Sequence, residues 1–331
     1  MIVSRAPVRF SLGGGGTDLP SYCDEHGGFL VAASIDKYIY VAANSRFYDN
    51  VLVKYSKTEE VATAAEIKHP LFREALDLAH VKSGIELVSI ADLPSNSGLG
   101  SSSAFTVALL NALHAFKREF VSTEQLAREA CNIEIDRLKE PIGKQDQYIS
   151  AYGGITAFTF EKGGGVQVER VPMKIDVVEE LEMNLLVFYS GVERKASDVL
   201  IEQKKTIQAN KDDAVKRMHR IKELGYETRK LLVDGDIDRY GELLHEHWTN
   251  KRKLASNMTD GAIDEHYEAA RKAGALGGKL MGAGGGGFFL FYVRPESRRR
   301  VYEALTARGL RQLRFRFDFD GARIMANFHR S

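Results

Sequence analysis

Apolar and polar residues alternate over residues 2–12, a pattern that predicts a β-strand with one buried face. The side chains that share the buried side are Ala6, Val8, Phe10 and Leu12. Arg9 falls on the other side, so its guanidinium is expected to emerge from the strand opposite the apolar layer.

The rest of the first half is expected to alternate strands with helices. Strands are predicted at residues 29–43, 51–55 and 85–91, and an amphipathic helix at residues 71–82. Residues 102–117 are apolar almost all round, which predicts a buried, central helix with a rigidly held N-terminus.

The character of the sequence changes after Tyr152, Gly153 and Gly154. The three glycines at 163–165 predict a hairpin tip, and residues 184–190 predict a buried strand that begins a second domain. Three or four helices are expected between residues 196 and 274, followed by a helix at 296–308 and strands at 311–319 and 323–328. We therefore expect an α+β protein with two domains, residues 1–160 and residues 161–331.

Composition excludes several classes of protein. A chain of 331 residues with 44% apolar content can bury a large core, and a formal charge of +1 argues against a nucleic-acid partner. Cys23 and Cys131 lie far apart and outside any metal-ligand spacing, which argues against structural zinc and against a disulfide framework. No apolar run reaches membrane-spanning length, and residues 1–12 lack the apolar core of a signal peptide. A soluble protein of the reducing cytoplasm is expected, and the sequence leaves a homodimer open.

Residues 94–104 read PSNSGLGSSSA and predict a phosphate-binding loop. Gly98 and Gly100 allow a tight turn, and the helix that follows offers unpaired N–H groups to an anion. Of the serines at 101–103, one could cap the helix and another could coordinate magnesium. The alternative is an ordinary glycine-serine loop that caps a helix. Two further glycine clusters, Gly13 to Gly16 and residues 282–287, favour the phosphate-binding interpretation.

The two familiar nucleotide-binding signatures are absent from the sequence. No GxxxxGK[ST] pattern occurs, because Lys144 and Lys279 follow glycine but precede Gln145 and Leu280. A dinucleotide-binding pattern would need a third glycine where Ser103 stands.

A helix is expected from Ser122, which has capping-box spacing to Gln125, to about residue 139. Glu134 projects close to the inner face of this helix, so its carboxylate needs a partner. Two interpretations remain open: an i,i+3 ion pair with Arg137, or a magnesium ligand that faces the serine loop. Pro141 and Gly143 then break the helix, which predicts that the next acidic residue, Asp146, lies on an irregular segment.

Three stretches, in this order and spacing, resemble the signature motifs of the GHMP kinase superfamily over essentially the whole chain. They are RAPVRFSLGGGGTDLP, PSNSGLGSSSA and KLMGAGGGGFF. Within the superfamily, GGGGTDLPSYCDEHGG, EPIGKQDQY and FRFDFDGARI look most like kinases that phosphorylate D-glycero-D-manno-heptose 7-phosphate at the anomeric hydroxyl. The resemblance implies a two-domain fold with an active-site cleft between the domains, and a product that feeds nucleotide-activated heptose and surface polysaccharide synthesis.

The resemblance also implies a role for individual residues, with ATP and Mg²⁺ as cofactors. Asp146 would be the general base, with Arg9 beside it to keep the carboxylate ionised and Lys144 sharing its work. Ser102 and Glu134 would hold magnesium. The nucleotide phosphates would bind Asn96, Gly98, Leu99, Gly100, Ser101, Ser102 and Ser103. The sugar would bind Gly14, Gly15, Gly16, Thr17, Asp18, Gly284 and Gly285.

A sugar that already carries phosphate calls for a second basic site. The first candidate is Arg194 with Lys195, and the second is the run Lys251, Arg252 and Lys253, although either cluster could be solvated surface. The histidines show no triad or metal spacing, so His247 is expected to be structural or on the surface. Two other functions stay open: a GHMP kinase for an unphosphorylated sugar such as L-fucose, and a non-catalytic sugar sensor on the same fold.

Overall fold

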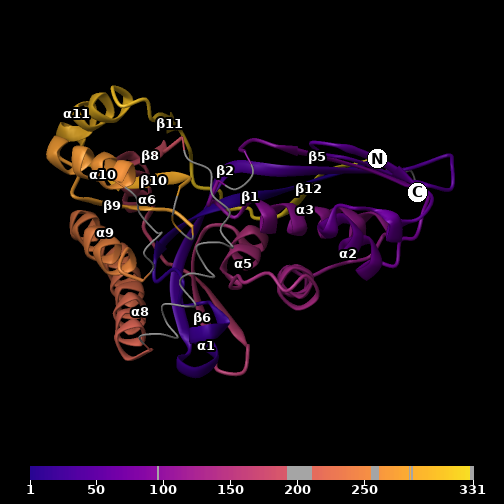
Figure 1. Ribbon diagram of the computed structural model, residues 1–331, viewed down its shortest axis with the longest axis horizontal. Helices are drawn as coiled ribbons and strands as arrows, with labels where there is room; N and C mark the ends of the chain where they lie inside the picture. Colours follow the sequence, from indigo (N-terminus) through magenta and orange to yellow (C-terminus); the bar gives the residue numbers. More distant parts are fainter. Residues whose placement is uncertain (95–96, 192–210, 255–260, 283, 285, 329–331) are drawn as a thin grey trace.

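The computed structural model describes residues 1–94, 97–191, 211–254, 261–282, 284 and 286–328, and Figure 1 shows two β-sheets with helices packed around them. In the described chain the larger sheet has eight strands, in the order β12-β1-β2-β5-β3-β4, with β6 paired to β2 and β7 paired to β6. Its strands are β1 (Ile2–Gly13), β2 (Gly28–Ser45), β3 (Val51–Lys54), β4 (Thr58–Val61), β5 (Ile85–Ala91), β6 (Ile155–Phe160), β7 (Val166–Arg170) and β12 (Arg323–Asn327).

The smaller sheet is antiparallel, with the strand order β11-β8-β10-β9. Its strands are β8 (Leu185–Tyr189), β9 (Gly277–Leu280), β10 (Phe288–Tyr292) and β11 (Arg311–Leu313). This mixed architecture confirms the α+β fold class. None of the described helices is both long enough and apolar enough to cross a membrane.

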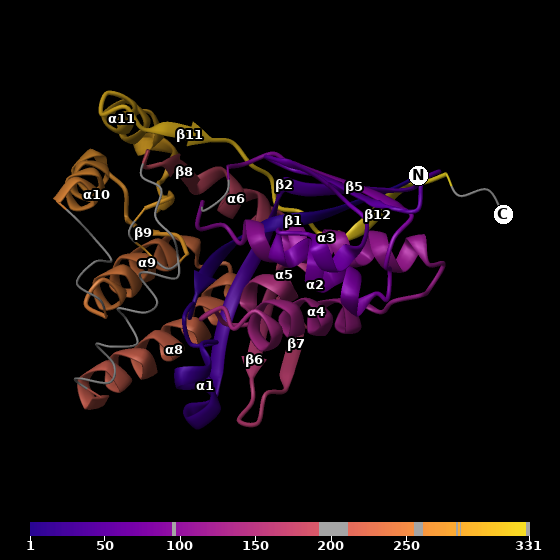
Figure 2. The same ribbon diagram turned by 45° about the vertical axis from the view of Figure 1, so that its right-hand side comes forward.

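Helices α2 (Pro70–Leu78), α3 (Ser101–Phe116), α4 (Thr123–Cys131) and α5 (Gln145–Tyr152) gather on one side of the larger sheet, as Figures 1 and 2 both show. Helix α1 (Pro20–His26) lies apart from them, near the end of β6. The first half also contains the 3-10 turn Ala64–Glu66 and the π-helical turn Asn132–Arg137. Helix α3 packs along β1 and β2 and is buried over most of its length, as its apolar sequence predicts.

The helices of the second half other than α8 (Lys211–Asp234) pack around the smaller sheet. They are α6 (Ile175–Asn184), α9 (Ile237–Lys251), α10 (Gly261–Ala273) and α11 (Pro295–Thr306). Helix α8 contacts β1 and β2, where Phe29 stacks on Tyr226 with ring centroids 3.9 Å apart. Because other elements cover β1, Arg9 and Ser11 on its polar side are only 5% and 6% exposed.

Three of the predicted elements differ from those observed. The helix expected at 71–82 ends at Leu78, because the chain turns through His80, which has a φ of 55°. The helix expected from Ser122 begins with the expected serine cap, but it changes to a π-helical turn after Cys131. The strand expected at 311–319 is short, and Phe317 forms a single bridge with Ile35 of β2.

After the smaller sheet, the chain returns to the larger sheet, where β12 pairs with β1. Strand β7 likewise belongs to the larger sheet, through the hairpin whose tip is at 163–165 as predicted. Both strands come after residue 160 but belong to the larger sheet. A domain boundary between residues 160 and 161 therefore does not coincide with the division between the two sheets, and it stays a prediction.

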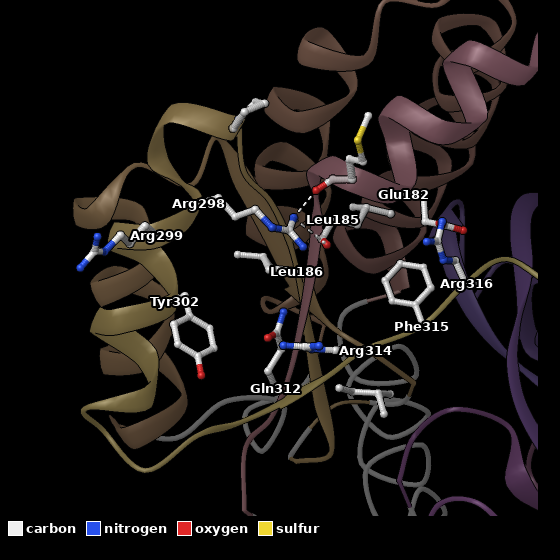
Figure 3. Close-up of a pocket in the computed structure, with 13 residues that line it drawn as sticks. Glu182, Leu185, Leu186, Arg298, Arg299, Tyr302, Gln312, Arg314, Phe315 and Arg316 are labelled. Carbon is white, nitrogen blue, oxygen red and sulfur yellow. Dashed lines mark hydrogen bonds and ion pairs between the residues drawn. The ribbon is translucent and has the colours of Figure 1, made fainter.

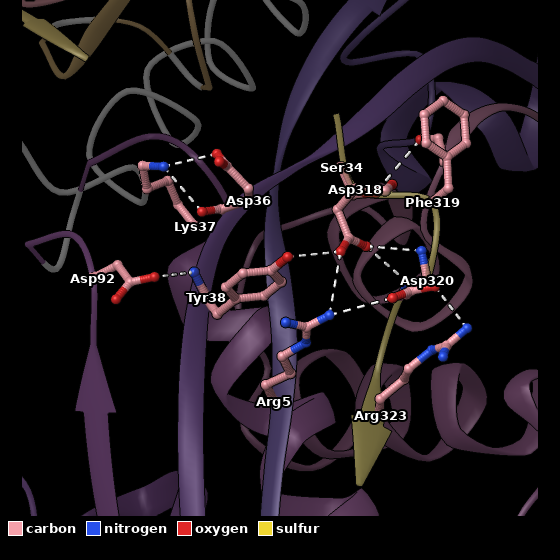
Figure 4. Close-up of polar contacts among 12 residues, drawn as sticks. Arg5, Ser34, Asp36, Lys37, Tyr38, Asp92, Asp318, Phe319, Asp320 and Arg323 are labelled. Carbon is pink, nitrogen blue, oxygen red and sulfur yellow. Dashed lines mark hydrogen bonds and ion pairs between the residues drawn. The ribbon is translucent and has the colours of Figure 1, made fainter. Parts of the chain in front are cut away.

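Asp318 fastens the returning segment to the larger sheet (Figure 4). Its Oδ2 accepts a hydrogen bond from the Tyr38 hydroxyl at 2.8 Å and lies 3.8 Å from the Arg5 guanidinium. Its Oδ1 accepts from the main-chain N–H groups of Asp320 and Gly321. The side chain is 4% exposed, so these hydrogen bonds and the ion pair replace the water that would otherwise solvate the carboxylate.

We expect Asp318→Ala to lower the free energy of unfolding by about 3 kcal/mol, because it leaves buried donors without their acceptor. Asp320→Ala is the matched control: its side chain is 42% exposed, and an exposed ion pair contributes only about 1 kcal/mol or less. Denaturant unfolding of the two variants measures the difference. An equal loss in both would show that Asp318 does not fasten the segment.

Candidate active site

The loop that precedes α3 is shaped by glycines with positive φ. Gly98 has a φ of 75° and Gly100 a φ of 77°, a conformation that favours glycine. Gly100 is the N-cap, and no side chain of the described residues caps the helix, so the expectation that one of Ser101 to Ser103 caps it is wrong. Ser101 instead lies with its hydroxyl 3.1 Å from that of Ser97. The first N–H groups of α3 are therefore free of a side-chain cap and suited to an anion.

The same loop packs against the third glycine-rich stretch, backbone to backbone. A Cβ atom at Gly282 would lie 2.7 Å from the carbonyl oxygen of Gly98, and one at Gly287 would lie 2.4 Å from that of Ser97. Such contacts leave no room for a side chain. The second and third motifs, which lie far apart in the sequence, thus meet at one place.

Arg9 and Asp146 form a two-pronged ion pair beside this loop. The Arg9 Nε and Nη2 atoms each donate to a different carboxylate oxygen of Asp146 at 2.7 Å. Arg9 also donates from Nη1 to the Gly98 carbonyl at 2.6 Å, and its main-chain N–H donates to that of Leu99 at 3.0 Å. The strand, the loop and the carboxylate are therefore held as one unit.

Asp146 lies in the first turn of α5, so the prediction of an irregular segment is wrong. The helix begins at Gln145, directly after the break at Pro141 and Gly143. The Asp146 side chain is 24% exposed, against 6% for Arg9, and a Cβ atom at Gly100 would lie 3.0 Å from its Oδ2. An accessible carboxylate therefore borders the expected phosphate position.

The first glycine turn brings Asp18 to the same region. Its Oδ2 accepts from the Gln145 main-chain N–H at 3.1 Å, and its Oδ1 accepts from that of Gly16 at 3.2 Å. Burial raises the pKa of Asp18, and the nearby charge of Asp146 adds to this rise, while the two N–H groups oppose it. Asp18 thus belongs to one electrostatic cluster with Asp146.

Thr17, by contrast, is enclosed in the turn. Its hydroxyl lies 2.8 Å from the Gly14 carbonyl oxygen and 2.9 Å from that of Phe29, and the residue is fully buried. In this structure Thr17 closes the turn, and its role toward a sugar hydroxyl stays a prediction. The same holds for Gly14, Gly15 and Gly16.

Glu134 is buried against the serine loop. Its Oε1 accepts from the Ser102 hydroxyl at 2.8 Å, and its Oε2 accepts from the Gln147 amide at 2.6 Å. Burial raises the pKa of Glu134 to about 7, although the hydrogen bonds from Ser102, Ser103 and Gln147 oppose the rise.

The alternative ion pair between Glu134 and Arg137 is wrong. Arg137 contacts Asp77 at 2.8 Å and Glu74 at 3.4 Å instead. The π-helical turn explains why, since the Leu138 N–H bonds to the carbonyl of Ile133, five residues earlier. This wider turn changes the spacing that would place residues three apart side by side.

Glu134 and Ser102 fit a magnesium ion that arrives with a nucleotide. A carboxylate and a hydroxyl are hard oxygen ligands, and Mg²⁺ is commonly held by one or two carboxylates together with substrate phosphates. Among the described residues, no group of three or more His, Cys, Asp or Glu side chains could hold a metal without such help.

Several predicted site residues are not brought together with this cluster. Lys144 donates from Nζ to the carbonyl of Gly164, at the tip of the β6–β7 hairpin, at 2.7 Å. Gly284 lies in the third glycine stretch with a φ of 106°. The residues Asn96, Arg194, Lys195 and Gly285 lie outside the described part of the chain.

Sequence reasoning assigned no binding role to Gln145, Gln147, His247 and Lys279, which lie in or beside this cluster. Gln145 and Gln147 hold the carboxylates of Asp146 and Glu134 through their side-chain amides. His247 and Lys279 are buried near the third glycine stretch, and Lys251 is buried as well although the sequence grouped it with the exposed Lys253. The spacing of four between His247 and Lys251 was the one available signal, since it places both on one helix face.

A cavity of about 720 Å³ lies elsewhere, between α6, α11, β8 and β11 (Figure 3). Of its arginines, Arg298 donates to main-chain carbonyl oxygens, and Arg316 pairs with Glu182 at 2.6 Å. The residues that line it include none of the predicted site residues.

Family models match both halves of the chain: the GHMP kinases N terminal domain at residues 57–154, and the GHMP kinases C terminal domain at residues 228–310. The chain belongs to the GHMP kinase family. As a GHMP kinase it is a phosphotransferase with an alcohol group as acceptor and ATP as a substrate. The N-terminal match includes the phosphate loop, Glu134 and Asp146.

Relatives match nearly the whole chain. D-glycero-alpha-D-manno-heptose 7-phosphate kinase of Campylobacter jejuni is 28% identical over 316 residues, which cover 92% of this chain and 93% of that protein. L-fucokinase/L-fucose-1-P guanylyltransferase of Bacteroides fragilis is 24% identical over 92% of this chain, which spans only 36% of that longer protein. The crystal structure of a D-glycero-D-manno-heptose 1-phosphate kinase from Bacteroides thetaiotaomicron superimposes with a TM-score of 0.83 at 25% identity, covering 99% of this chain and 100% of that one.

Proposed function

We propose that this GHMP kinase is a sugar kinase that transfers the γ-phosphate of ATP to the anomeric hydroxyl of D-glycero-D-manno-heptose 7-phosphate. The observation that carries the proposal is the accessible Asp146 carboxylate, paired with Arg9 and bordering the phosphate loop at Gly100. The heptose 7-phosphate kinase of Campylobacter jejuni, similar over 92% of this chain, supports the choice of substrate.

The reacting groups would act mainly by position and charge. Asp146 would accept the proton of the sugar hydroxyl as that oxygen attacks the γ-phosphorus, and ADP would leave. Arg9 holds the Asp146 carboxylate in place through two hydrogen bonds and would stabilise charge on the moving phosphoryl group. Backbone N–H groups at the start of α3 would receive the other phosphate oxygens.

Magnesium would be held by Ser102 and Glu134, as their geometry allows. When bound, the ion neutralises charge on the β- and γ-phosphates. Gln147 keeps the Glu134 carboxylate oriented toward the serine loop through its 2.6 Å hydrogen bond.

A kinase for an unphosphorylated sugar such as L-fucose is the second candidate, and the similarity to the fucokinase of Bacteroides fragilis favours it. A non-catalytic sugar sensor finds less support, because Arg9, Asp146, Ser102 and Glu134 are all present and arranged in one cluster. A binding module has no need of a base and a metal site.

The proposed substrate is tested by ADP release with a panel of sugars. The panel contains D-glycero-D-manno-heptose 7-phosphate, its 1-phosphate, the free heptose and L-fucose. We expect the 7-phosphate to give the highest kcat/KM, by more than a factor of ten, because two charge-assisted contacts to a phosphate contribute about 1.5 to 3 kcal/mol each. Equal efficiency with the free heptose, or better turnover of L-fucose, would reject the substrate and leave the kinase activity intact.

A further inference from the structure

Three basic side chains are buried together between α9 and β9. His247 and Lys251 lie four residues apart, on one face of α9, and Lys279 lies on β9, against which this helix packs. Their residues are 2%, 8% and 1% exposed, respectively. Lysine is almost never buried to this extent without a partner of opposite charge.

The cluster has few hydrogen-bond acceptors of its own. The Lys251 ammonium donates to the Gly282 carbonyl at 2.6 Å. The Lys279 ammonium and both ring nitrogens of His247 find no hydrogen-bond partner among the described residues. Burial lowers the pKa of all three groups, to about 8 for Lys251, and their proximity to one another lowers the values for His247 and Lys279 further. A buried polar group without a partner costs free energy, so the arrangement calls for an anion.

The cluster adjoins the active site. Gly282, the acceptor for Lys251, packs directly on Gly98 of the phosphate loop. Lys251 also lies close enough to Asp18, Asp146 and Arg9 for their charges to influence it. An anion that contacts Lys251 and Lys279 would therefore lie within the reacting assembly.

We propose that His247, Lys251 and Lys279 form a second phosphate site of the kinase, next to Gly282, which packs on the phosphate loop at Gly98. The inference rests on the proposed function, because it assigns a place to a phosphoryl group in that reaction. The group has two sources with the same chemistry: the phosphate that the sugar already carries, or the γ-phosphoryl group in transfer. Of the run Lys251, Arg252 and Lys253 that the sequence suggested, this site keeps Lys251 and leaves out Lys253, which is exposed.

The variants Lys251→Met and Lys279→Met test the site, with Lys272→Met as the control, an exposed lysine in the last turn of α10. KM and kcat are measured for ATP, heptose 7-phosphate and the free heptose. If the sugar phosphate binds here, KM for heptose 7-phosphate rises about 10- to 100-fold while the values for free heptose and ATP stay near those of the parent. If the transferred group binds here, kcat falls by a similar factor with both sugars. Either result supports the site, provided that Lys272→Met behaves like the parent.

A stability measurement separates a ligand site from a structural role. The buried Lys279 amino group has no hydrogen-bond partner among the described residues, which destabilises the ligand-free protein. Lys279→Met is therefore expected to unfold at the same denaturant concentration as the parent or at a higher one. Constants within threefold of the parent for every substrate, with or without a drop in stability, would overturn the proposal. If the protein rejects heptose 7-phosphate altogether, the substrate assignment fails, and the ATP and free-heptose measurements still decide the phosphate site.

Discussion

Asp146→Asn is expected to reduce turnover by about two to four decades while the affinity for ATP stays near that of the parent. General acid–base catalysis typically contributes this much, and the asparagine amide cannot accept a proton at neutral pH. The structure supports the role, because the carboxylate borders the phosphate loop and is accessible to a hydroxyl group. Steady-state kinetics and ATP binding measure the two quantities separately.

In the Asp146→Asn variant an NH2 group takes the place of one carboxylate oxygen and cannot accept a hydrogen bond from the Arg9 guanidinium. One of the two hydrogen bonds at 2.7 Å is therefore expected to be lost. Kinetics are therefore compared at a temperature where both proteins are folded. Asp24→Asn, which changes an exposed carboxylate on α1, is the control and should turn over at the parent rate. Turnover of Asp146→Asn within a few-fold of the parent would remove Asp146 from the role of base.

Glu134→Gln is expected to keep the fold and to lose about two to three decades of turnover with magnesium and ATP. The amide matches the carboxyl in size and can still accept from Ser102 and face Gln147, but it carries no charge to neutralise the metal. Kinetics at saturating ATP and a titration of magnesium binding in the presence of ADP measure the effect.

Asp136→Asn is the matched control, because Asp136 belongs to the same π-helical turn and is exposed. It should bind magnesium and turn over as the parent does. If Glu134→Gln instead unfolds more easily but retains its turnover per folded molecule, Glu134 stabilises the loop and does not bind the metal.

The local sequence pattern was sufficient to predict an element and its buried face where the apolar residues follow one regular period. The alternation in residues 2–12 placed Ala6, Val8, Phe10 and Leu12 on the buried side, and all four are fully buried. The helix predicted at 102–117 was also correct to within a residue at each end, because its apolar surface can only be satisfied inside the molecule. The strand and the helix that carry Arg9 and the serine loop were therefore predictable.

The pattern was insufficient to predict side-chain contacts where the helix geometry changes within an element, or where the contacting residues lie far apart in the sequence. A constant 3.6-residue period cannot reveal the π-helical turn that turns Arg137 toward Asp77 and leaves Glu134 facing Ser102. Nor does a sequence distinguish a buried lysine from an exposed one when both lie in a charged run. Lys251 and Lys253 read alike, and only the packing of α9 on β9 separates them.

The pairing of β12 with β1 also determines when the larger sheet can be completed during translation. Ile2 pairs with Asn327, so the strand that opens the larger sheet acquires one of its neighbours only after the smaller domain has been translated. Until the ribosome releases that segment, one edge of β1 presents unpaired N–H and C=O groups, the kind of surface to which other chains add. Closure of so long a loop is also slow. The larger sheet therefore gains β12 only late in synthesis, and until then the edge of β1 is expected to be the place where the newly made chain is most open to association with other chains.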